Sequence, residues 1–239
     1  MTTAAEKPGP PIGPPATHLL FENDDVRIWQ QYAKAGTTYP FHYHDYDYVL
    51  FYLTDVLATN SGTEDHHRVW DARFDHGEKL PESPAGILTR AQACFYIPGS
   101  GFLSPGFHNV GDTDMIAPLI EVKRPRRPDQ EGIGYARTDA LVGLPPRPGC
   151  IHLLENDRLR VWQTALAPGA SDGPRQRLDT AVYVIDGSQL RILEEGPAGT
   201  RTREEERASA SGLWLPGGVR RQLTNLGSAP YRELEVELK

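Results

Sequence analysis

Short runs of β-branched and aromatic residues alternate with turn-forming residues along this chain. The runs cover residues 26–32, 46–53, 93–98, 119–122, 159–164, 181–185, 190–193, 212–216 and 231–238. Glycine (23 residues) and proline (21 residues) are abundant, and long helical patterns are scarce. Many short strands separated by frequent turns predict an all-β sandwich or barrel.

The pattern occurs twice. Residues 22–49 align with residues 155–182 without a gap at an offset of 133, and Gly36 falls on Gly169. A duplicated segment predicts two copies of one structural unit. We therefore expect four segments, which are a mobile, proline-rich N-terminus at 1–16, a first unit at 17–122, a linker at 123–149 and a second unit at 150–239.

The net charge of the chain limits the classes of partner that it can be expected to bind. The sequence has 32 acidic and 25 basic residues, a formal net charge of −7 at pH 7. This balance argues against nucleic acid as a partner, since phosphate binding favours a basic face. No apolar run approaches the roughly 20 residues of a membrane helix, and the N-terminal segment lacks the apolar core of a signal peptide. We expect a cytoplasmic protein without a membrane partner.

Two histidines are spaced two residues apart in the first copy. Side chains in a strand alternate between its faces, so His42 and His44 point the same way. The same holds for Tyr46 and Tyr48. Two imidazoles at this spacing inside a barrel lie close enough to share one divalent metal ion, since neutral imidazole is a common metal ligand. In the alternative, both histidines lie on a solvent face among neighbouring aspartates.

The first copy resembles the cupin superfamily at this point. The first motif of that family is a glycine, five residues, His-x-His and, after three or four residues, a glutamate. Gly36, His42 and His44 match its spacing, and Tyr48 stands where the family has the glutamate.

The second copy carries the second cupin motif. That motif is Pro-x-Gly, two residues, a histidine, three residues and an asparagine. Pro216, Gly218 and Asn225 hold the spacing, with Arg221 in place of the histidine. The resemblance covers residues 17–122 and 150–238, so the chain is similar to a bicupin. It implies two jelly-roll-type (cupin) β-barrels that form an intrachain pseudo-dimer.

The resemblance also implies a metal ion or a small-molecule pocket. In the first copy we assign His42 and His44 as metal ligands, and of the candidates for a third ligand we prefer His108 and then Tyr48. The ion would be one divalent transition metal, Fe, Zn or Ni, in the first barrel. The alternative is a metal-free pocket in which His42, His44 and Tyr48 act as acid, base or hydrogen-bonding groups.

Arginines stand at the ligand positions of the second copy. Arg175 and Arg177 replace the two histidines, Ala181 falls at the carboxylate position, and Arg221 takes the last place. A guanidinium stays protonated and does not bind a cation, so we expect no metal in the second barrel and a structural role for it. We expect these arginines to pair with acidic residues, and the candidates are Asp179, Asp186, Glu194 and an acidic loop. An anion pocket is the alternative.

Aromatic residues crowd the first copy near the histidines, which favours an apolar pocket for a small organic substrate. A metal with open positions suits an oxygenase, which we favour slightly because such enzymes are frequent in the family. A Lewis-acid isomerase, lyase or cyclase is the second alternative, with Tyr48 or Tyr46 transferring protons. A non-catalytic binding protein is the third. Because cupins often pair, the resemblance also implies a homodimer.

Overall fold

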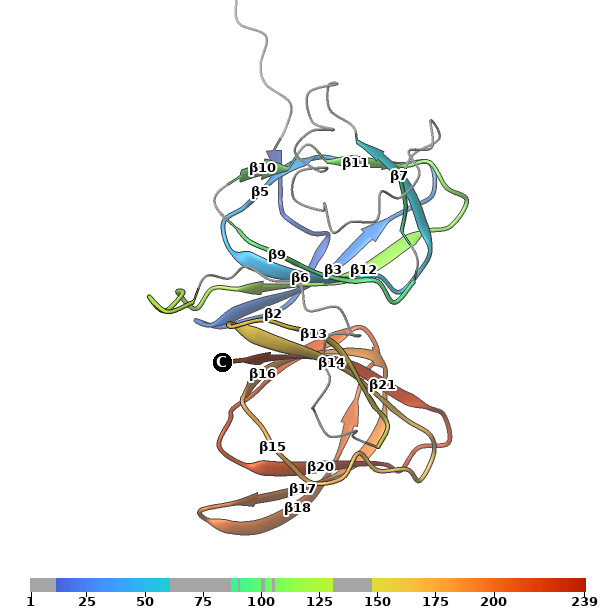
Figure 1. Cartoon of the computed structure of the whole chain (residues 1–239). Helices are drawn as coiled ribbons and strands as arrows, with labels where there is room; N and C mark the ends of the chain where they lie inside the picture. Colours follow the sequence, from blue (N-terminus) through green and yellow to red (C-terminus); the bar gives the residue numbers. More distant parts are fainter. Residues whose placement is uncertain (1–11, 61–86, 90, 100–101, 105, 131–147) are drawn as a thin grey trace, which may run out of the picture.

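The chain folds into two β-rich units stacked on one another (Figure 1). The structure is a computed structural model that describes residues 12–60, 87–89, 91–99, 102–104, 106–130 and 148–239. Every regular element in these ranges is a β-strand, and the same ranges contain no helix long and apolar enough to span a membrane. Parts of the predicted N-terminus and linker, at 1–11 and 131–147, lie outside the described residues.

The first unit, called the first barrel below, has one large and two smaller sheets. The large sheet has the strand order β2 (His18–Glu22), β3 (Val26–Ala33), β12 (Met115–Val122), β6 (Asp47–Phe51), β9 (Cys94–Ile97). One smaller sheet has the order β4 (Thr38–Tyr39), β11 (Phe107–Asn109), β7 (Val56–Asn60), β8 (Ile87–Thr89). The other has the order β1 (Ile12–Gly13), β5 (Phe41–His44), β10 (Phe102–Ser104).

The second unit, the second barrel, repeats this plan. Its large sheet has the order β13 (Cys150–Glu155), β14 (Leu159–Leu166), β21 (Tyr231–Leu238), β16 (Asp179–Asp186), β19 (Ser211–Leu215). The facing sheet has the order β15 (Arg175–Gln176), β20 (Arg220–Asn225), β17 (Ser188–Gly196), β18 (Gly199–Arg207). Each strand of the first large sheet has its counterpart at the same place in the second, which confirms an all-β chain built from a duplicated unit.

The two large sheets pack against each other and join the barrels into an intrachain pseudo-dimer (Figure 1). Alternate residues of β3, Val26 and Ile28, share one buried cluster with Leu234 and Val236 of β21. Because side chains alternate along a strand, the residues between them face the barrel interiors. Each buried aliphatic side chain of this size contributes about 1.5–3 kcal/mol of hydrophobic stabilisation.

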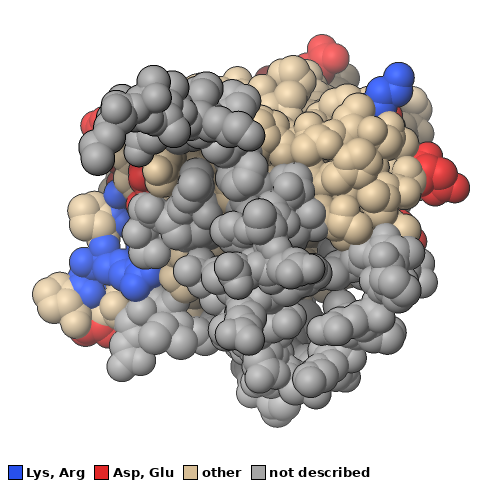
Figure 2. Space-filling view, turned by 90° about the horizontal axis from the view of Figure 1, so that it is seen from above, with Lys and Arg blue, Asp and Glu red and all other residues tan. Residues whose placement is uncertain are grey.

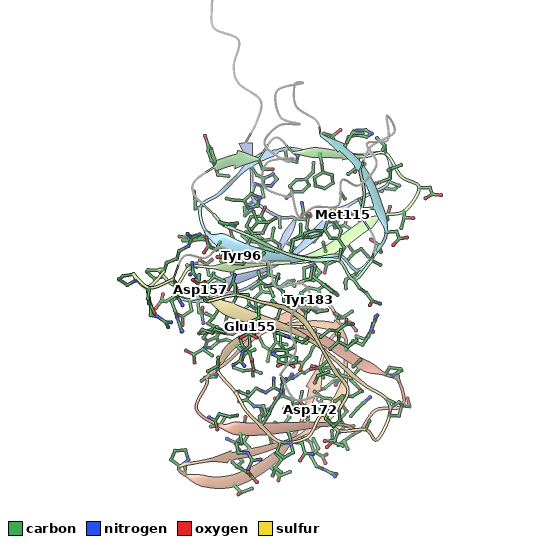
Figure 3. The ribbon with its side chains drawn as sticks, viewed as in Figure 1. Tyr96, Met115, Glu155, Asp157, Asp172 and Tyr183 are labelled. Atoms are coloured by element: carbon green, nitrogen blue, oxygen red, sulfur yellow. The ribbon has the colours of Figure 1, made fainter. Side chains whose placement is uncertain are left out.

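Each barrel also has an interior of its own. Tyr48, Met115 and Leu119 belong to the buried apolar cluster of the first barrel, and Figure 3 shows Met115 inside it. Val182 and Leu223 belong to the corresponding cluster of the second barrel. The end of the first barrel that faces away from the second has a mostly uncharged described surface, with charged side chains at its margins (Figure 2).

The last residue of β11 and the last residue of β20 are asparagines, Asn109 and Asn225. Each holds together two neighbouring backbone segments at the same place in its barrel, called the corner below. Asn109 Nδ2 donates hydrogen bonds to the carbonyls of Ala33 (3.1 Å) and Thr113 (2.9 Å). Asn225 donates the same two bonds in the second barrel, at 3.0 and 2.8 Å. Buried carbonyls need such partners, so this asparagine has a structural function in both copies.

A glycine with positive φ reaches the same corner. Gly36 has a φ of 75° and Gly169 has a φ of 76°, a backbone conformation that residues with a Cβ atom rarely adopt. Their backbone N–H groups donate to the carbonyls of Asn109 and Asn225, each at 2.8 Å. These contacts confirm the predicted correspondence of the two glycines.

The gapless alignment of the two copies, however, ends before residue 47. Gly99 N donates to Asp47 Oδ1 at 2.8 Å, and Gly217 N donates to Asp179 Oδ1 at 2.8 Å. Asp47 therefore corresponds to Asp179, at an offset of 132, because the first copy has one more residue between the histidine pair and this aspartate.

The shifted alignment changes one predicted position. The counterpart of Tyr48 is Thr180, since both pair across the ladder with corresponding glutamates, Glu121 and Glu237. Ala181 lies instead in the cluster between the barrels. The prediction that Ala181 occupies the carboxylate position of the second barrel is thereby corrected.

The first barrel begins before residue 17. Strand β1 pairs in parallel with β5, and Ala16 is fully buried in the interior cluster of the first barrel. These residues belong to the segment that the sequence pattern assigned to the N-terminal lead-in. Proline-rich composition favours an extended chain, and an extended chain can add to a sheet edge.

The predicted linker begins with a basic run, residues 123–127, two of whose arginines form ion pairs with residues of the barrels. Arg124 donates to Asp25 at 2.8 Å and to Asp179 at 2.7 Å, and so bridges the two barrels. Arg126 donates to Asp47 at 2.6 Å. Arg124 therefore helps to hold the two barrels together.

Candidate functional site in the first barrel

Two buried imidazoles face each other inside the first barrel. His42 and His44 of β5 are 4% and 2% exposed, whereas Tyr43 between them is 44% exposed. Their Nε2 atoms lie 3.0 Å apart. The alternation of a β-strand thus turns both rings inward, and the alternative of a solvent-facing pair is wrong.

The surroundings keep both rings neutral. His42 Nδ1 lies 2.9 Å from the carbonyl oxygen of Pro40, which can only accept, so this nitrogen carries the proton and Nε2 carries a lone pair. Burial lowers the pKa of His42, against a smaller opposing effect of the Pro40 bond. Burial and the neighbouring His42 lower the pKa of His44 to about 3. Neutral imidazole is the form that binds metal ions.

The donor atoms fit a divalent metal ion. Two metal–nitrogen bonds of about 2.1 Å that meet at a right angle put their nitrogens about 3.0 Å apart, which is the observed separation of the Nε2 atoms. The Pro40 carbonyl holds the His42 ring in the tautomer that a metal ligand needs. Without a cation, the same geometry requires His44 Nε2 to donate its proton to His42 Nε2.

Aromatic rings line the pair on two sides. Tyr48 stacks on His44 with ring centroids 4.1 Å apart and an interplanar angle of 17°. Tyr39 meets His42 edge-on at 5.3 Å and stacks on Phe107 at 5.5 Å. Tyr39 is the residue whose proximity the sequence alone did not single out, since it reaches His42 from a different strand. The result is an apolar wall with two imidazoles in it.

Tyr46, the other predicted proton-transfer residue, lies in a different environment. Its half-buried ring lies against the Arg27 guanidinium, whose carbon is 5.3 Å from the ring centroid. Strand β5 ends at His44 and β6 begins at Asp47, so the alternation that would place Tyr46 beside Tyr48 is broken between them. The structure thus brings Tyr48, and not Tyr46, to the imidazole pair.

His108 faces the opposite side of its strand. Its neighbour Phe107 stacks on Tyr39, which contacts His42, so Phe107 points into the barrel. Alternation turns His108 outward, where its Nδ1 lies 2.8 Å from the Thr38 hydroxyl. The preferred third ligand is therefore not brought to the pair. Within the part of the chain that the structure describes, no three His, Cys, Asp or Glu side chains gather as a metal site.

The inner face of β12 carries a buried carboxylate that the sequence did not point to. Glu121 is 1% exposed and accepts a hydrogen bond from Trp29 Nε1 at 2.8 Å. Burial raises its pKa, against the Trp29 hydrogen bond. Glu237 accepts the same bond from Trp162 at 3.0 Å in the second barrel. The recurrence indicates a structural pair, and the signal in the sequence is the tryptophan found in both copies.

The second barrel places arginines where the first has imidazoles. Arg175 and Arg177 both donate to Glu235, and Arg177 also reaches Asp172 at 3.4 Å. Leu119 is the counterpart of Glu235, because each pairs with the corresponding tryptophan of its barrel. Two histidines and a leucine have thus been exchanged for two arginines and a glutamate.

The predicted partners of these arginines are only partly correct. Arg221 donates to Glu194 at 2.8 Å, as expected. Asp186, by contrast, accepts from Arg232, and Asp179 accepts from Arg124. Sequence reasoning missed Glu235 because it lies in the last strand, far along the chain from the arginines.

The sequence matches no protein-family model and no curated protein. Among solved structures, AerE from Microcystis aeruginosa is similar, with 13% identity and a TM-score of 0.58 over 92% of this chain and 90% of that chain. Oxalate decarboxylase from Bacillus subtilis at pH 4.6 has 10% identity and a TM-score of 0.56 over 90% and 68%. A second structure of that enzyme, described for its Mn(II) centres, has 11% identity and a TM-score of 0.55 over 90% and 69%.

At these identities the likeness shows the fold. Each match extends over both barrels of this chain, since it covers 90% or more of its length. The predicted fold class, all-β with two jelly-roll-type (cupin) barrels in one chain, is confirmed.

Proposed function

We propose that this protein is a metal-dependent enzyme that acts on a small organic molecule inside the first barrel. His42 and His44 would hold one divalent transition metal ion through their Nε2 atoms. The observation that carries the proposal is the pair of buried, neutral imidazoles whose Nε2 atoms lie 3.0 Å apart. The Mn(II) centres named for oxalate decarboxylase, a protein of the same fold, add Mn to the proposed ions Fe, Zn and Ni.

The residues around the pair would orient the substrate. A bound ion would supply a Lewis acid or, if it is redox-active, a centre for oxidation. Tyr48 and Tyr39 place aromatic rings beside the imidazoles, which suits a substrate with flat or apolar parts. The hydroxyl of Tyr48 is the proposed proton-transfer group, because this ring stacks on His44. Pro40 holds His42 in the required tautomer.

The class of reaction is the finer part of the proposal. We favour an oxygenase, in keeping with the frequency of such enzymes in the family that the sequence resembles. A non-redox isomerase, lyase or cyclase is the second candidate, and it is favoured by the described ligand set, which has imidazoles without a carboxylate. We propose a small-molecule substrate and a second copy of the chain as partners, and neither nucleic acid nor a membrane. We propose that the protein acts in the cytoplasm.

A non-catalytic binding protein is the remaining candidate function. The observation in its favour is that only two imidazoles meet at the site among the described residues. Such a protein would bind its small molecule beside the same two imidazoles and release it unchanged.

Metal analysis of the untagged protein tests the proposal. We expect about one equivalent of iron, zinc, nickel or manganese by mass spectrometry, and its loss in both His42→Ala and His44→Ala. His108→Ala is the matched control, because this histidine faces outward and should leave the metal content unchanged. Iron would favour the oxygenase, and zinc or nickel would favour Lewis-acid chemistry. Wild-type protein without metal after growth and purification in metal-supplemented medium would contradict the proposal.

A further inference from the structure

The interior of the second barrel holds an unusual concentration of buried charge. Four arginines are at least nine-tenths buried, and they are Arg175, Arg177, Arg207 and Arg221. Three buried carboxylates lie among them, and they are Asp172, Glu233 and Glu235. Figure 3 shows Asp172 inside this barrel. Buried ionised groups of this kind are costly unless each is paired and fully hydrogen-bonded.

These arginines are not fully hydrogen-bonded. Five buried guanidinium nitrogens have no hydrogen-bond partner among the described residues, and they are Nε and Nη1 of Arg175, Nε of Arg177, Nη2 of Arg207 and Nη1 of Arg221. An unpaired buried donor costs about 1–3 kcal/mol, and more when it is charged. The interior of the second barrel therefore holds unpaired guanidinium donors, together with one unpaired carboxylate oxygen, Oε1 of Glu233.

Three of the guanidinium groups also crowd one another. Arg175 and Arg221 are direct partners across the β15–β20 ladder. Arg177 lies two residues along from Arg175, on the same inward face, and is 1% exposed. Like charges at directly opposed positions destabilise a sheet. Burial and the neighbouring Arg175 lower the pKa of Arg177 to about 10, so this group keeps its charge at neutral pH.

The carboxylates nearby are shared rather than matched one to one. Glu235 accepts from both Arg175 and Arg177. The same carboxylate also accepts from the Thr164 hydroxyl at 2.6 Å. Arg221 is held by Glu194 at the edge of the barrel, where that carboxylate is 20% exposed. A further oxyanion among Arg175, Arg177 and Arg221 would accept hydrogen bonds from their unpaired nitrogens and offset the repulsion between their charges.

We propose that the second barrel is a binding site for a small oxyanion, a carboxylate or phosphate group held between Arg175, Arg177 and Arg221. Guanidinium groups suit both anions, because their N–H donors form a planar fork that matches the oxygens. The site occupies the place that corresponds to the imidazole pair of the first barrel. The duplicated fold thus offers a cation site in one copy and an anion site in the other.

Titration calorimetry of the full, untagged chain tests the site. Sodium phosphate and sodium acetate are the probes, with sodium chloride at the same ionic strength as the reference. We expect saturable binding of phosphate or acetate, one per chain, with a Kd below about 1 mM. Binding of phosphate alone would assign the site to phosphate groups, and binding of acetate would assign it to carboxylates. Absence of saturable binding for both probes overturns the proposal.

Variants locate the anion. Arg221→Gln removes a donor near the barrel edge and should weaken binding about tenfold or more, since a lost charge-assisted hydrogen bond is worth at least that factor. Arg191→Gln is the matched control, because Arg191 pairs with Glu204 on the surface and both are about half exposed, at 51% and 48%. Unchanged affinity in Arg221→Gln contradicts the proposal.

Two further measurements separate this site from the first barrel and from misfolding. A His42→Ala/His44→Ala double variant should bind phosphate as the wild type does, and lost binding there would place the anion in the first barrel and overturn the proposal. Wild-type crystals soaked in selenate should show an anomalous peak within hydrogen-bond distance of Arg177 or Arg221. Water alone at these nitrogens would refute the site even if Arg221→Gln failed to fold.

Discussion

The Asp47 carboxylate of the first barrel accepts a hydrogen bond from the Arg158 guanidinium of the second barrel. Both side chains are buried, and Asp47 also accepts from the Tyr96 hydroxyl at 2.6 Å. Asp47 is the first residue of β6, and the next residue, Tyr48, stacks on His44. This ion pair therefore connects the second barrel to the strand that carries the aromatic wall of the candidate site.

Removing the charge of Asp47 should destabilise the protein strongly. Asp47→Asn leaves Arg158 buried without its counter-charge, and breaking a buried pair from one side costs about 3–5 kcal/mol. Asp179→Asn is the matched control at the corresponding position, where the side chain is 36% exposed. Exposed pairs contribute about 1 kcal/mol or less. Urea denaturation of both variants measures the difference, and equal losses would contradict a special role for Asp47.

The same carboxylate should make the stability fall in acid. Burial alone raises the pKa of Asp47, but hydrogen bonds from Arg126 and Tyr96 and the charge of Arg158 bring it below the ordinary value of 3.8. An acid with a lowered pKa in the folded chain stabilises the fold above its unfolded pKa, and this contribution is lost as the pH falls through the folded pKa. The stability advantage of the wild type over Asp47→Asn should therefore be complete at pH 7 and shrink below about pH 4.

Denaturation curves at several pH values measure that advantage. Other carboxylates with lowered pKa values, such as Glu22 and Asp179, are present in both proteins and cancel in the comparison. An advantage that stays constant down to pH 3 would show that the charge of Asp47 does not cause it.

Metal binding should stabilise the wild-type protein through the two inward histidines. A ligand that binds only the folded state adds about 2.7 kcal/mol when its free concentration is 100 times Kd. Adding the native metal to chelator-treated protein should raise the thermal midpoint of the wild type and of His108→Ala, and leave His42→Ala unchanged. An equal rise in His42→Ala would place the metal at another site.

The two corner asparagines should matter equally. Asn109→Ala leaves the carbonyls of Ala33 and Thr113 without their donor, and unpaired buried groups cost about 1–3 kcal/mol each. We expect a loss of about 2–4 kcal/mol in the free energy of unfolding for Asn109→Ala and a similar loss for Asn225→Ala. His108→Ala, one residue earlier on the same strand, should change it by about 0.5 kcal/mol or less. A large effect in one barrel alone would contradict the equivalence of the two corners.

Local features of this protein were predictable because they follow from the period of a strand. The inward direction of His42 and His44 needs only the alternation of side chains in β5, and the outward Tyr43 agrees with it. The duplicated fold follows likewise, since two similar sequences form two similar units. His108 was the preferred third ligand among the candidates considered with the family resemblance, and its outward position shows that side-chain alternation along β11 is the better guide.

Contacts between distant segments could not be read in the same way. The extra residue before Asp47 shifts the register of the first copy, and the shift is revealed by the cross-strand pairs of β6 and β16 and by the matching hydrogen bonds to Asp47 and Asp179. Glu235 meets Arg175 and Arg177 because β21 lies across the barrel from β15, about 60 residues away in sequence. The packing of the two sheets of the second barrel against each other brings these charges together.

From its sequence the chain specifies two β-barrels and an inward pair of imidazoles, since hydrophobic periodicity and strand alternation act over a few residues. The tertiary structure decides which side chains complete each interior, because the partners of a buried group come from strands that neighbour it only after folding. The first barrel thereby surrounds its histidines with Tyr39 and Tyr48, while the second surrounds its arginines with Asp172 and Glu235.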